Sequence, residues 1–515
     1  MAKAPWTRPA KRVFSSALEG IERVGNRLPD PFMLFVYLFA VLAVVSTVFA
    51  ALGTTVTIPG TSKPIAIRGL FTGDGAEFLI TKMIENFIEF PPLGNVLLML
   101  MAVGVAERTG LLKAVVRAAL TRVSGRVLPY AVAFVGFQAH VMSDVSMIVI
   151  PPLAALLFRE AGRHPVAGLI GGFACVSGGY GAGLLLGSSD ALLAGITSKA
   201  VDILPMGTGI DTHIAMNWFF TAASGLVLPF VGGWITAHIV EPRLGTYQDI
   251  EAGDDEVASG LDPVERRGLR NALITLAVYL LVVFGGWLVP GSPLRGDNGA
   301  FVPSPFLSGL VPILFVAFLA TGIVYGLSIR AVTSNRDVPR LMADSVKEVA
   351  GYIVLIFAVS QFIALFSWTN VGSLLAVKSA EALTALGLTG FGGILLFVAL
   401  ASMLNLFIIS GSAMWSLMAP VFIPAFLLLG FEPGLVQAAF RIGDSATQII
   451  TPMNPYLLVL LTFVRKYQPG TGLGTLMARL SIYVIPFWVF WAALLAVFYF
   501  AEIPVGPGTP IHLPH

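Results

Sequence analysis

The sequence predicts an all-α polytopic membrane protein, because of its composition and the length of its apolar runs. Of the 515 residues, 56% are hydrophobic and only 12% are charged, whereas about a quarter of the residues in a soluble domain are charged. A chain this apolar needs the lipid bilayer as solvent for much of its surface. Backbone polar groups in lipid need internal partners, which leaves helices or closed barrels. The runs are about 20 residues long, as in spanning helices, and not the ~10-residue strands of barrels.

Eleven apolar runs follow one another along the chain. Two of them, 127–158 and 391–429, are too long for one span and too short for two, and each has polar or Gly-rich residues in its middle. We interpret both as re-entrant hairpins that enter and leave the membrane on the same side. The other runs predict nine transmembrane helices at 32–52, 83–105, 166–190, 217–240, 271–290, 305–329, 349–370, 434–464 and 475–500.

The distribution of positive charge predicts the orientation of these helices. With a cytoplasmic N-terminus, 24 of the 31 Lys and Arg residues fall in predicted cytoplasmic segments, six fall in outer segments, and Arg441 lies inside a span. This excess agrees with the positive-inside rule. The hairpin 127–158 then enters from the cytoplasm and the hairpin 391–429 from outside. Segment 107–126 combines basic and aliphatic residues and predicts an amphipathic interfacial helix.

These boundaries divide the chain into five parts. The linker between the halves carries eight acidic and four basic residues and predicts a solvated segment. The parts are a cytoplasmic N-terminal segment 1–31, a first membrane half 32–240 with hairpin 127–158 and broken helix 166–200, a cytoplasmic linker 241–270, a second membrane half 271–500 with hairpin 391–429 and broken helix 434–464, and a periplasmic tail 501–515.

The order of a hairpin followed by an interrupted helix occurs twice and predicts an inverted repeat. The distance from the hairpin tip to the end of the break is 47 residues in the first half (Ser143 to Asp190) and 44 in the second (Ser410 to Asn454). The predicted breaks contain Gly178–Gly181 and Gly187–Asp190, then Gly443–Ser445 and Thr451–Pro455. Such repeats are typical of secondary transporters. The alternative is that Gly and Pro only kink the helices.

Charged residues inside the membrane are costly and usually face a site or a partner. Arg441 and Asp444 lie three residues apart on the second broken helix. One interpretation is a mutual salt bridge. The other is that Arg441 receives a substrate carboxylate, which a guanidinium binds through two hydrogen bonds, and that Asp444 takes a cation or a proton.

Oxygen-bearing side chains near the second break predict a sodium site. Asn405, Asp444 and Asn454 could supply ligands together with Ser410 or Ser412 at the hairpin tip. Each Asn could instead form a hydrogen bond between helices.

Three further residues have two interpretations each. Asp190 follows a Gly-Ser-Ser break and could carry a cation or proton, or could cap the next helix. Trp415 could stack on an aromatic substrate ring, or could pack or face lipid. His140, near the first tip, weakly suggests proton handling.

Several other functional classes have little support. The sequence contains no HExxH zinc motif, no phosphate-binding loop and no metal-ligand spacing among its six His residues. We therefore expect neither an enzyme nor a resident cofactor, apart from a bound Na⁺ ion. The net charge of +2 argues against nucleic acid as a partner, and the single cysteine, Cys175, excludes an intramolecular disulfide.

Three long motifs resemble the p-aminobenzoyl-glutamate transporter (AbgT) family. They are NLFIISGSAMWSLMAP from Asn405 to Pro420, RIGDSATQIITPMNPY from Arg441 to Tyr456, and GSSDALLAGIT from Gly187 to Thr197. The resemblance implies a homodimer in the bacterial inner membrane, with nine spanning helices and two hairpins. It also implies transport of p-aminobenzoyl-glutamate and, as in some members, export of sulfonamide antimetabolites. Because the sequence has no phosphate-binding loop, we expect an ion gradient to supply the energy.

The resemblance also assigns residues. It implies that Asp190, Trp415, Pro433, Arg441 and Asp444 are important for transport, and that sodium binds near Asn405, Asp444 and Asn454. The alternative within the same class is a sodium-coupled dicarboxylate symporter, which should need more basic residues at its site.

Overall fold

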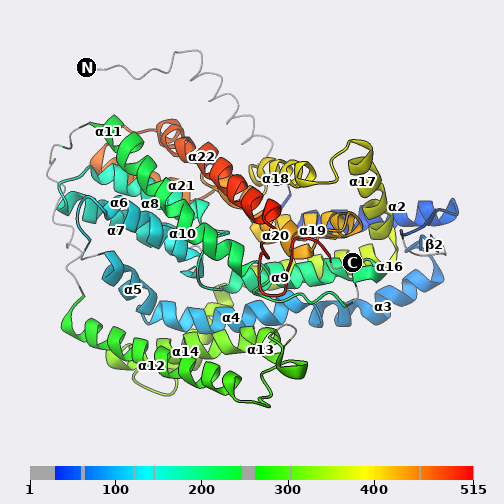
Figure 1. Ribbon diagram of the computed structural model, residues 1–515, viewed down its shortest axis with the longest axis horizontal. Coiled ribbons are helices and arrows are strands. Elements are labelled where there is room, and N and C mark those ends of the chain that lie inside the picture. Colours follow the sequence, from blue (N-terminus) through cyan, green and yellow to red (C-terminus); the bar gives the residue numbers. More distant parts are fainter. Residues whose placement is uncertain are drawn as a thin grey trace, which may run out of the picture.

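The computed structural model describes residues 29–513, apart from 60–63, 121–122, 143–144, 208, 246, 248–260, 302–303, 349 and 452–453. It is a bundle of helices with one two-stranded antiparallel sheet, in which β1 (Thr55–Val56) pairs with β2 (Ile65–Ala66) (Figure 1). Ser143 and Asp144 of the predicted first tip, and Pro452 and Met453 of the second break, lie outside the described residues.

The helices of the first half include the predicted hairpin and broken helix. The helix α10 passes without a gap into a π-helix, Thr236–Val240, and then into α11. The bounds are α2 Pro31–Ala51, α3 Gly73–Ile88, α4 Pro91–Arg108, α5 Leu111–Leu120, α6 Leu128–Gln138, α7 Val145–Glu160, α8 Pro165–Gly178, α9 Ser188–Val201, α10 Trp218–Ile235 and α11 Glu241–Leu244.

The second half repeats the order of a helix pair followed by an interrupted helix. Its bounds are α12 Pro263–Leu288, α13 Pro305–Ser308, α14 Leu310–Ser328, α15 Asp337–Glu348, α16 Ala350–Trp368, α17 Val371–Ala385, α18 Phe391–Asn405, α19 Gly411–Leu428, α20 Pro433–Gln448, α21 Tyr456–Tyr467 and α22 Leu473–Phe500.

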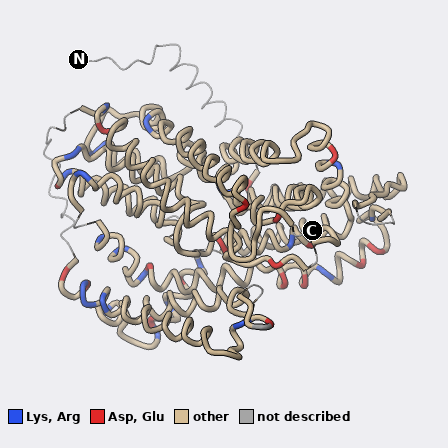
Figure 2. Tube along the Cα trace, viewed as in Figure 1, with Lys and Arg blue, Asp and Glu red and all other residues tan. Residues whose placement is uncertain are grey.

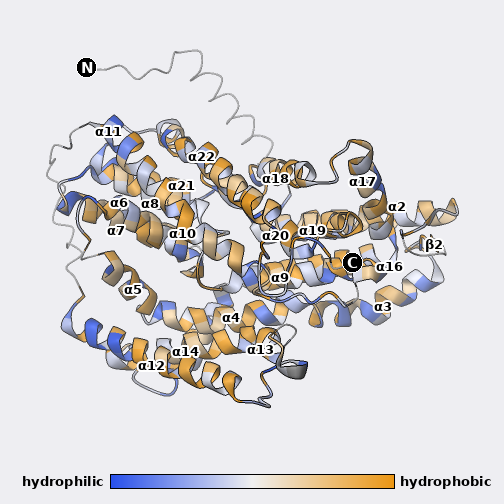
Figure 3. Cartoon of the chain, viewed as in Figure 1, coloured by the Kyte–Doolittle hydropathy of each residue, from blue (hydrophilic) through white to orange (hydrophobic). Residues whose placement is uncertain are grey.

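Eight helical stretches in the described part of the chain are long and apolar enough to cross a membrane. The predicted number of spans was nine. Seven of them are among these eight stretches, and the two interrupted helices are missing because they consist of short pieces. The eighth stretch is α19, which belongs to the predicted second hairpin. Hydrophobic residues run along most of these helices, and many of the Lys and Arg residues lie at the left-hand end of the view (Figures 2 and 3). The fold is therefore an all-helical, multi-pass membrane protein.

Three predicted boundaries need correction. The predicted span 83–105 is covered by two successive helices, α3 and α4, which meet at Glu89–Phe90. The helix α12 begins at Pro263 and not at 271, because Asp262 and Glu265 form a capping box there. The segment after 370 was predicted to be an outer connection but contains the helix α17, which packs against α19.

The helix α8 is buried along its entire length and lies close to its neighbours. A Cβ added at Gly136 of α6 would lie 2.9 Å from Cys175 Cβ, and one added at Gly232 of α10 would lie 2.6 Å from Cys175 Sγ. These two glycines therefore let α6 and α10 approach α8 on either side of the fully buried thiol.

The tail after α22 packs onto the turn between α19 and α20. Residues 505–513 contact that turn and the start of α10, so they connect the two halves. The hydrogen bonds run from Glu432 N to Ile511 O (3.1 Å), from Leu513 N to Gly430 O (2.9 Å) and from Phe220 N to Val505 O (3.0 Å).

Candidate functional site

The two interrupted helices meet at their breaks. The first break separates α8 from α9, and the second separates α20 from α21. Gly181 N in the first break donates to Ser445 Oγ of α20 over 2.8 Å. A Cβ at Gly181 would lie 2.9 Å from Arg441 Cβ, so only glycine allows this approach.

One part of the predicted second break is wrong. Gly443–Ser445 is helical within α20, and the interruption begins after Gln448. A Cβ at Gly443 would lie 2.5 Å from Ala401 Cβ. Gly443 therefore serves the close packing of α20 against α18 and does not end the helix.

A buried ion pair links the two halves beside these breaks. Arg441 Nη2 lies 2.8 Å from Asp190 Oδ1, and the two side chains are 3% and 4% exposed. Arg441 Nε also donates to Asn217 Oδ1 over 3.2 Å. Asp190 Oδ2 accepts a 2.7 Å hydrogen bond from Gly187 N, so Asp190 caps α9 and neutralises Arg441 at once.

This ion pair excludes one of the alternatives drawn from the sequence. Among the described residues, Arg441 pairs with Asp190 of the other half and not with Asp444 on its own helix. A charge pair removed from water in this way is stabilised by direct contact and by further hydrogen bonds. The partner Asn217 carried no sequence signal, since it follows no motif and begins an ordinary apolar helix.

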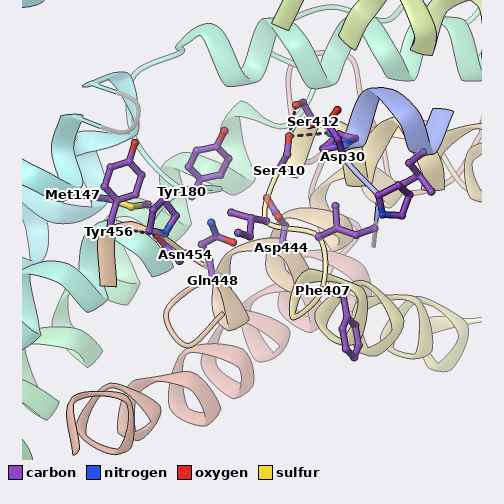
Figure 4. A pocket seen from close by; sticks show the side chains of 18 residues that line it. Asp30, Met147, Tyr180, Phe407, Ser410, Ser412, Asp444, Gln448, Asn454 and Tyr456 are labelled. Carbon is purple, nitrogen blue, oxygen red and sulfur yellow. Dashed lines mark hydrogen bonds between the residues drawn. The ribbon is translucent and has the colours of Figure 1, made fainter. Parts of the chain in front are cut away.

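A cavity of about 480 Å³ lies next to the second break (Figure 4). Both halves and the start of α2 contribute to its wall. Its polar lining residues are Asp30, Tyr180, Ser410, Ser412, Asp444, Gln448, Asn454 and Tyr456, and its apolar lining includes Leu34, Met147 and Phe407. The structure therefore brings together the predicted residues Ser410, Ser412, Asp444 and Asn454, and adds Tyr180, Gln448 and Tyr456.

The N-terminus of α19 faces the carboxylate of Asp444 at this cavity. Ser410 caps the helix by accepting from Ala413 N over 3.3 Å, and its Oγ lies 2.9 Å from Ser412 Oγ. A Cβ at Gly411 would lie only 2.7 Å from Asp444 Oδ2. The positive end of the helix dipole is thus directed at a negative side chain.

Of the predicted sodium-site residues, Asn405 contacts the backbone of Asp444, and Asn454 lines the same cavity as the Asp444 side chain. Asn405 Nδ2 donates to Thr447 Oγ1 over 3.0 Å and to the backbone oxygen of Asp444. This leaves Asn405 Oδ1 buried without a hydrogen-bond partner among the described residues. Asn454 Oδ1 accepts from Tyr456 N over 3.0 Å. Amide and carboxylate oxygens are the kind of ligand that a hard cation prefers.

Five predicted residues lie outside the cavity lining: Asp190, Asn405, Arg441, Trp415 and Pro433. Arg441 is held by Asp190. Trp415 is completely buried, and its Nε1 donates to Thr197 Oγ1 over 3.1 Å, which joins α19 to α9. Pro433 is the first residue of α20, at the opposite end of that helix from the break.

His140 lies beside the first break. Its Nε2 lies 2.8 Å from Leu185 O. Gly183 has a φ of +153°, and a Cβ there would lie 2.0 Å from the His140 ring. The ring therefore fixes the path of the loop that leads to α9.

Two interrupted helices whose broken ends meet around buried charges, in a bundle of apolar helices, define a multi-pass membrane transporter. Residues 16–513 match the AbgT putative transporter family, and the chain belongs to that family. It is a transporter and not an enzyme.

Several relatives are similar over almost the whole chain. The p-aminobenzoyl-glutamate transport protein of Escherichia coli is 37% identical over 490 residues, which are 95% of each chain. The YdaH transporter of Alcanivorax borkumensis is 38% identical, with a TM-score of 0.88 over 93% of this chain and 100% of its own. MtrF of Neisseria gonorrhoeae, described with a class of antimetabolite efflux pumps, is 38% identical, with a TM-score of 0.90 over 96% of this chain and 100% of its own.

Proposed function

We propose that this protein is an ion-coupled secondary transporter of p-aminobenzoyl-glutamate or related aromatic anions, and that it also exports sulfonamide antimetabolites. The observation that carries the proposal is the buried Arg441–Asp190 pair between the two broken helices. A guanidinium at this depth can hold a substrate carboxylate. The names of the Escherichia coli and Neisseria gonorrhoeae relatives support the choice of substrates.

The proposed topology has nine transmembrane helices and two re-entrant hairpins in an inverted repeat. The pairs α6–α7 and α18–α19 form the hairpins, and α8–α9 and α20–α21 form the broken helices. We place the N-terminus in the cytoplasm and the protein in the bacterial inner membrane as a homodimer. The excess of Lys and Arg in the predicted cytoplasmic segments supports this orientation.

Exchange of partners at Arg441 would couple substrate to a proton. Asp190 as a carboxylate holds Arg441, and a substrate carboxylate must compete with it. Protonation of Asp190 weakens this hold and leaves Arg441 available to the substrate. Asp190 is therefore the proposed proton carrier, and its protonation and substrate binding are linked through Arg441.

The coupling cation would bind on the other side of the second break. Asn405, Asp444 and Asn454 would supply its oxygen ligands, and Ser410 and Ser412 would donate to the substrate from the hairpin tip. These side chains lie around or beside the 480 Å³ cavity.

The proposed role of Trp415 is contact with the aromatic ring of the substrate. Because its indole is held by Thr197, this contact requires α19 to move away from α9. Pro433 begins α20, the helix that carries Arg441, and so sets where that helix starts.

Counterflow in proteoliposomes tests the proposal. Labelled p-aminobenzoyl-glutamate should exchange with unlabelled compound and with a sulfonamide, and pH and sodium gradients should be imposed one at a time. We expect Asp190→Asn to remove the response to the pH gradient and Asp444→Asn to remove the response to sodium. Competition by a simple dicarboxylate but not by the aromatic compounds would refute the assignment and favour a dicarboxylate symporter.

A further inference from the structure

An apolar slot lies between α6, α10 and α22. Its volume is about 510 Å³. At least half of the surface of Phe230, Trp234 and Phe490 is exposed, so the slot is open to the lipid. Its other walls include Tyr130, Ile239 and Pro486.

Irregularities in two of the helices form this slot. Pro486 lies inside α22, where it removes a backbone hydrogen bond. The helix α10 changes into the π-helix Thr236–Val240, which carries Ile239. From Phe230 to Ile239 the helix rises by about 14 Å, which is close to half of the ~30 Å hydrocarbon core. The slot thus has the length of one leaflet.

Two exposed arginines lie at the end of the slot on the predicted cytoplasmic side. Arg126 is four residues before Tyr130, and Arg243 is four residues after Ile239. A third arginine, Arg163, joins the two positions: its Nη1 donates to Gly125 O over 2.6 Å, and its Nε donates to Glu241 over 3.1 Å. Arg163 is paired with Glu241, whereas Arg126 and Arg243, which precede and follow the slot residues by one helical turn in the sequence, are exposed.

We propose that this slot binds one acyl chain of an anionic phospholipid, whose phosphate lies between Arg126 and Arg243. The apolar walls take the acyl chain along one leaflet. The two guanidiniums attract a negative headgroup and bind phosphate oxygens through paired hydrogen bonds. A zwitterionic lipid would fill the slot equally well but would lack the net charge.

Tryptophan quenching by brominated lipid tests this proposal directly, because Trp234 lines the slot. The purified full-length protein would be reconstituted with brominated phosphatidylglycerol or brominated phosphatidylcholine. The difference between the wild type and Trp234→Phe isolates the signal of this one indole. We expect phosphatidylglycerol to quench that signal at a concentration at least roughly tenfold lower than phosphatidylcholine, because two basic residues at the membrane surface attract the anionic headgroup.

Two variants separate the headgroup from the acyl chain. Arg126→Gln combined with Arg243→Gln should remove the preference for phosphatidylglycerol, while Arg336→Gln, at an exposed arginine between α14 and α15, should keep it. Val231→Phe should fill the slot and reduce quenching by both lipids. Equal quenching by both lipids in the wild type, or an unchanged preference in the double variant, would overturn the proposal.

Discussion

Replacing Arg441 by methionine should isolate a buried carboxylate and reveal the energy of the central ion pair. The side chains of Arg441 and Asp190 are 3% and 4% exposed, so water cannot replace the lost guanidinium. Removing one member of such a pair costs about 3–5 kcal/mol. Asp190 keeps its hydrogen bond from Gly187 N, which places the expected loss toward the lower end of that range.

The double variant Arg441→Met with Asp190→Asn should recover most of this loss, because no charge is then left buried. Unfolding midpoints in detergent measure the stability, and counterflow of p-aminobenzoyl-glutamate measures transport. We expect the double variant to be more stable than Arg441→Met alone and still inactive, because the substrate carboxylate has no guanidinium to bind.

Two results would refute this reasoning. If the double variant is no more stable than Arg441→Met, the two residues are not energetically coupled. If it transports at the wild-type rate, Arg441 does not bind substrate. The control is Arg117→Met, which breaks a partly exposed pair with Glu265 and should cost about 1 kcal/mol or less.

Three further substitutions probe the break regions and the cytoplasmic loops. Gly411→Ala places a Cβ 2.7 Å from Asp444 Oδ2, so it should cost about 1–3 kcal/mol and raise the sodium concentration needed for half-maximal transport. Gly183→Ala adds strain at φ +153° to a clash with His140, and should lower the unfolding free energy by about 3 kcal/mol or more. Burial lowers the pKa of His164, the N-cap of α8, below 6.5. The neutral imidazole should therefore stabilise the fold fully above pH 6.5, and this stabilisation should be lost as the pH falls. We expect His164→Gln to reduce the pH dependence of the unfolding midpoint.

Matched controls make these three results interpretable. Gly94→Ala in α4 meets no atom within 4 Å and should be neutral or slightly stabilising. His238→Gln replaces a histidine of the π-helix that is not a cap. The reasoning fails if Gly183→Ala is as stable as Gly94→Ala, if Gly411→Ala leaves the sodium response unchanged, or if His164→Gln has the same pH profile as His238→Gln.

The sequence allowed most of the helices to be predicted, because each apolar run ends where a charge would otherwise enter lipid. The two helix pairs were predicted from the unusual length of their apolar runs, and the two interrupted helices from the Gly and Pro residues within theirs. The helix α17 was missed because Lys378 and Glu381 give it the composition of a loop. Its many Ala and Leu residues favour a helix, and packing against α19 buries one side of it.

The candidate site was predicted only in part. Residue types identified Asp444, Asn454, Ser410 and Ser412, which the structure places around one cavity. The partner of Arg441 could not be deduced, because helical spacing reports only on neighbours within one helix and therefore offered only Asp444 as a possible partner. The contact with Asp190 depends on how the two halves meet, which the spacing within either half does not encode.

Cys175 of α8, which lies between Gly136 of α6 and Gly232 of α10, can report when these three helices separate. Because Cys175 is the only thiol in the chain and is completely enclosed, a thiol reagent can react with it only after α6 and α10 separate from α8. The rate of modification of the unaltered protein would therefore measure how often this three-helix contact loosens. A cysteine introduced at the surface would react much faster and could be labelled selectively, with the native thiol left unmodified.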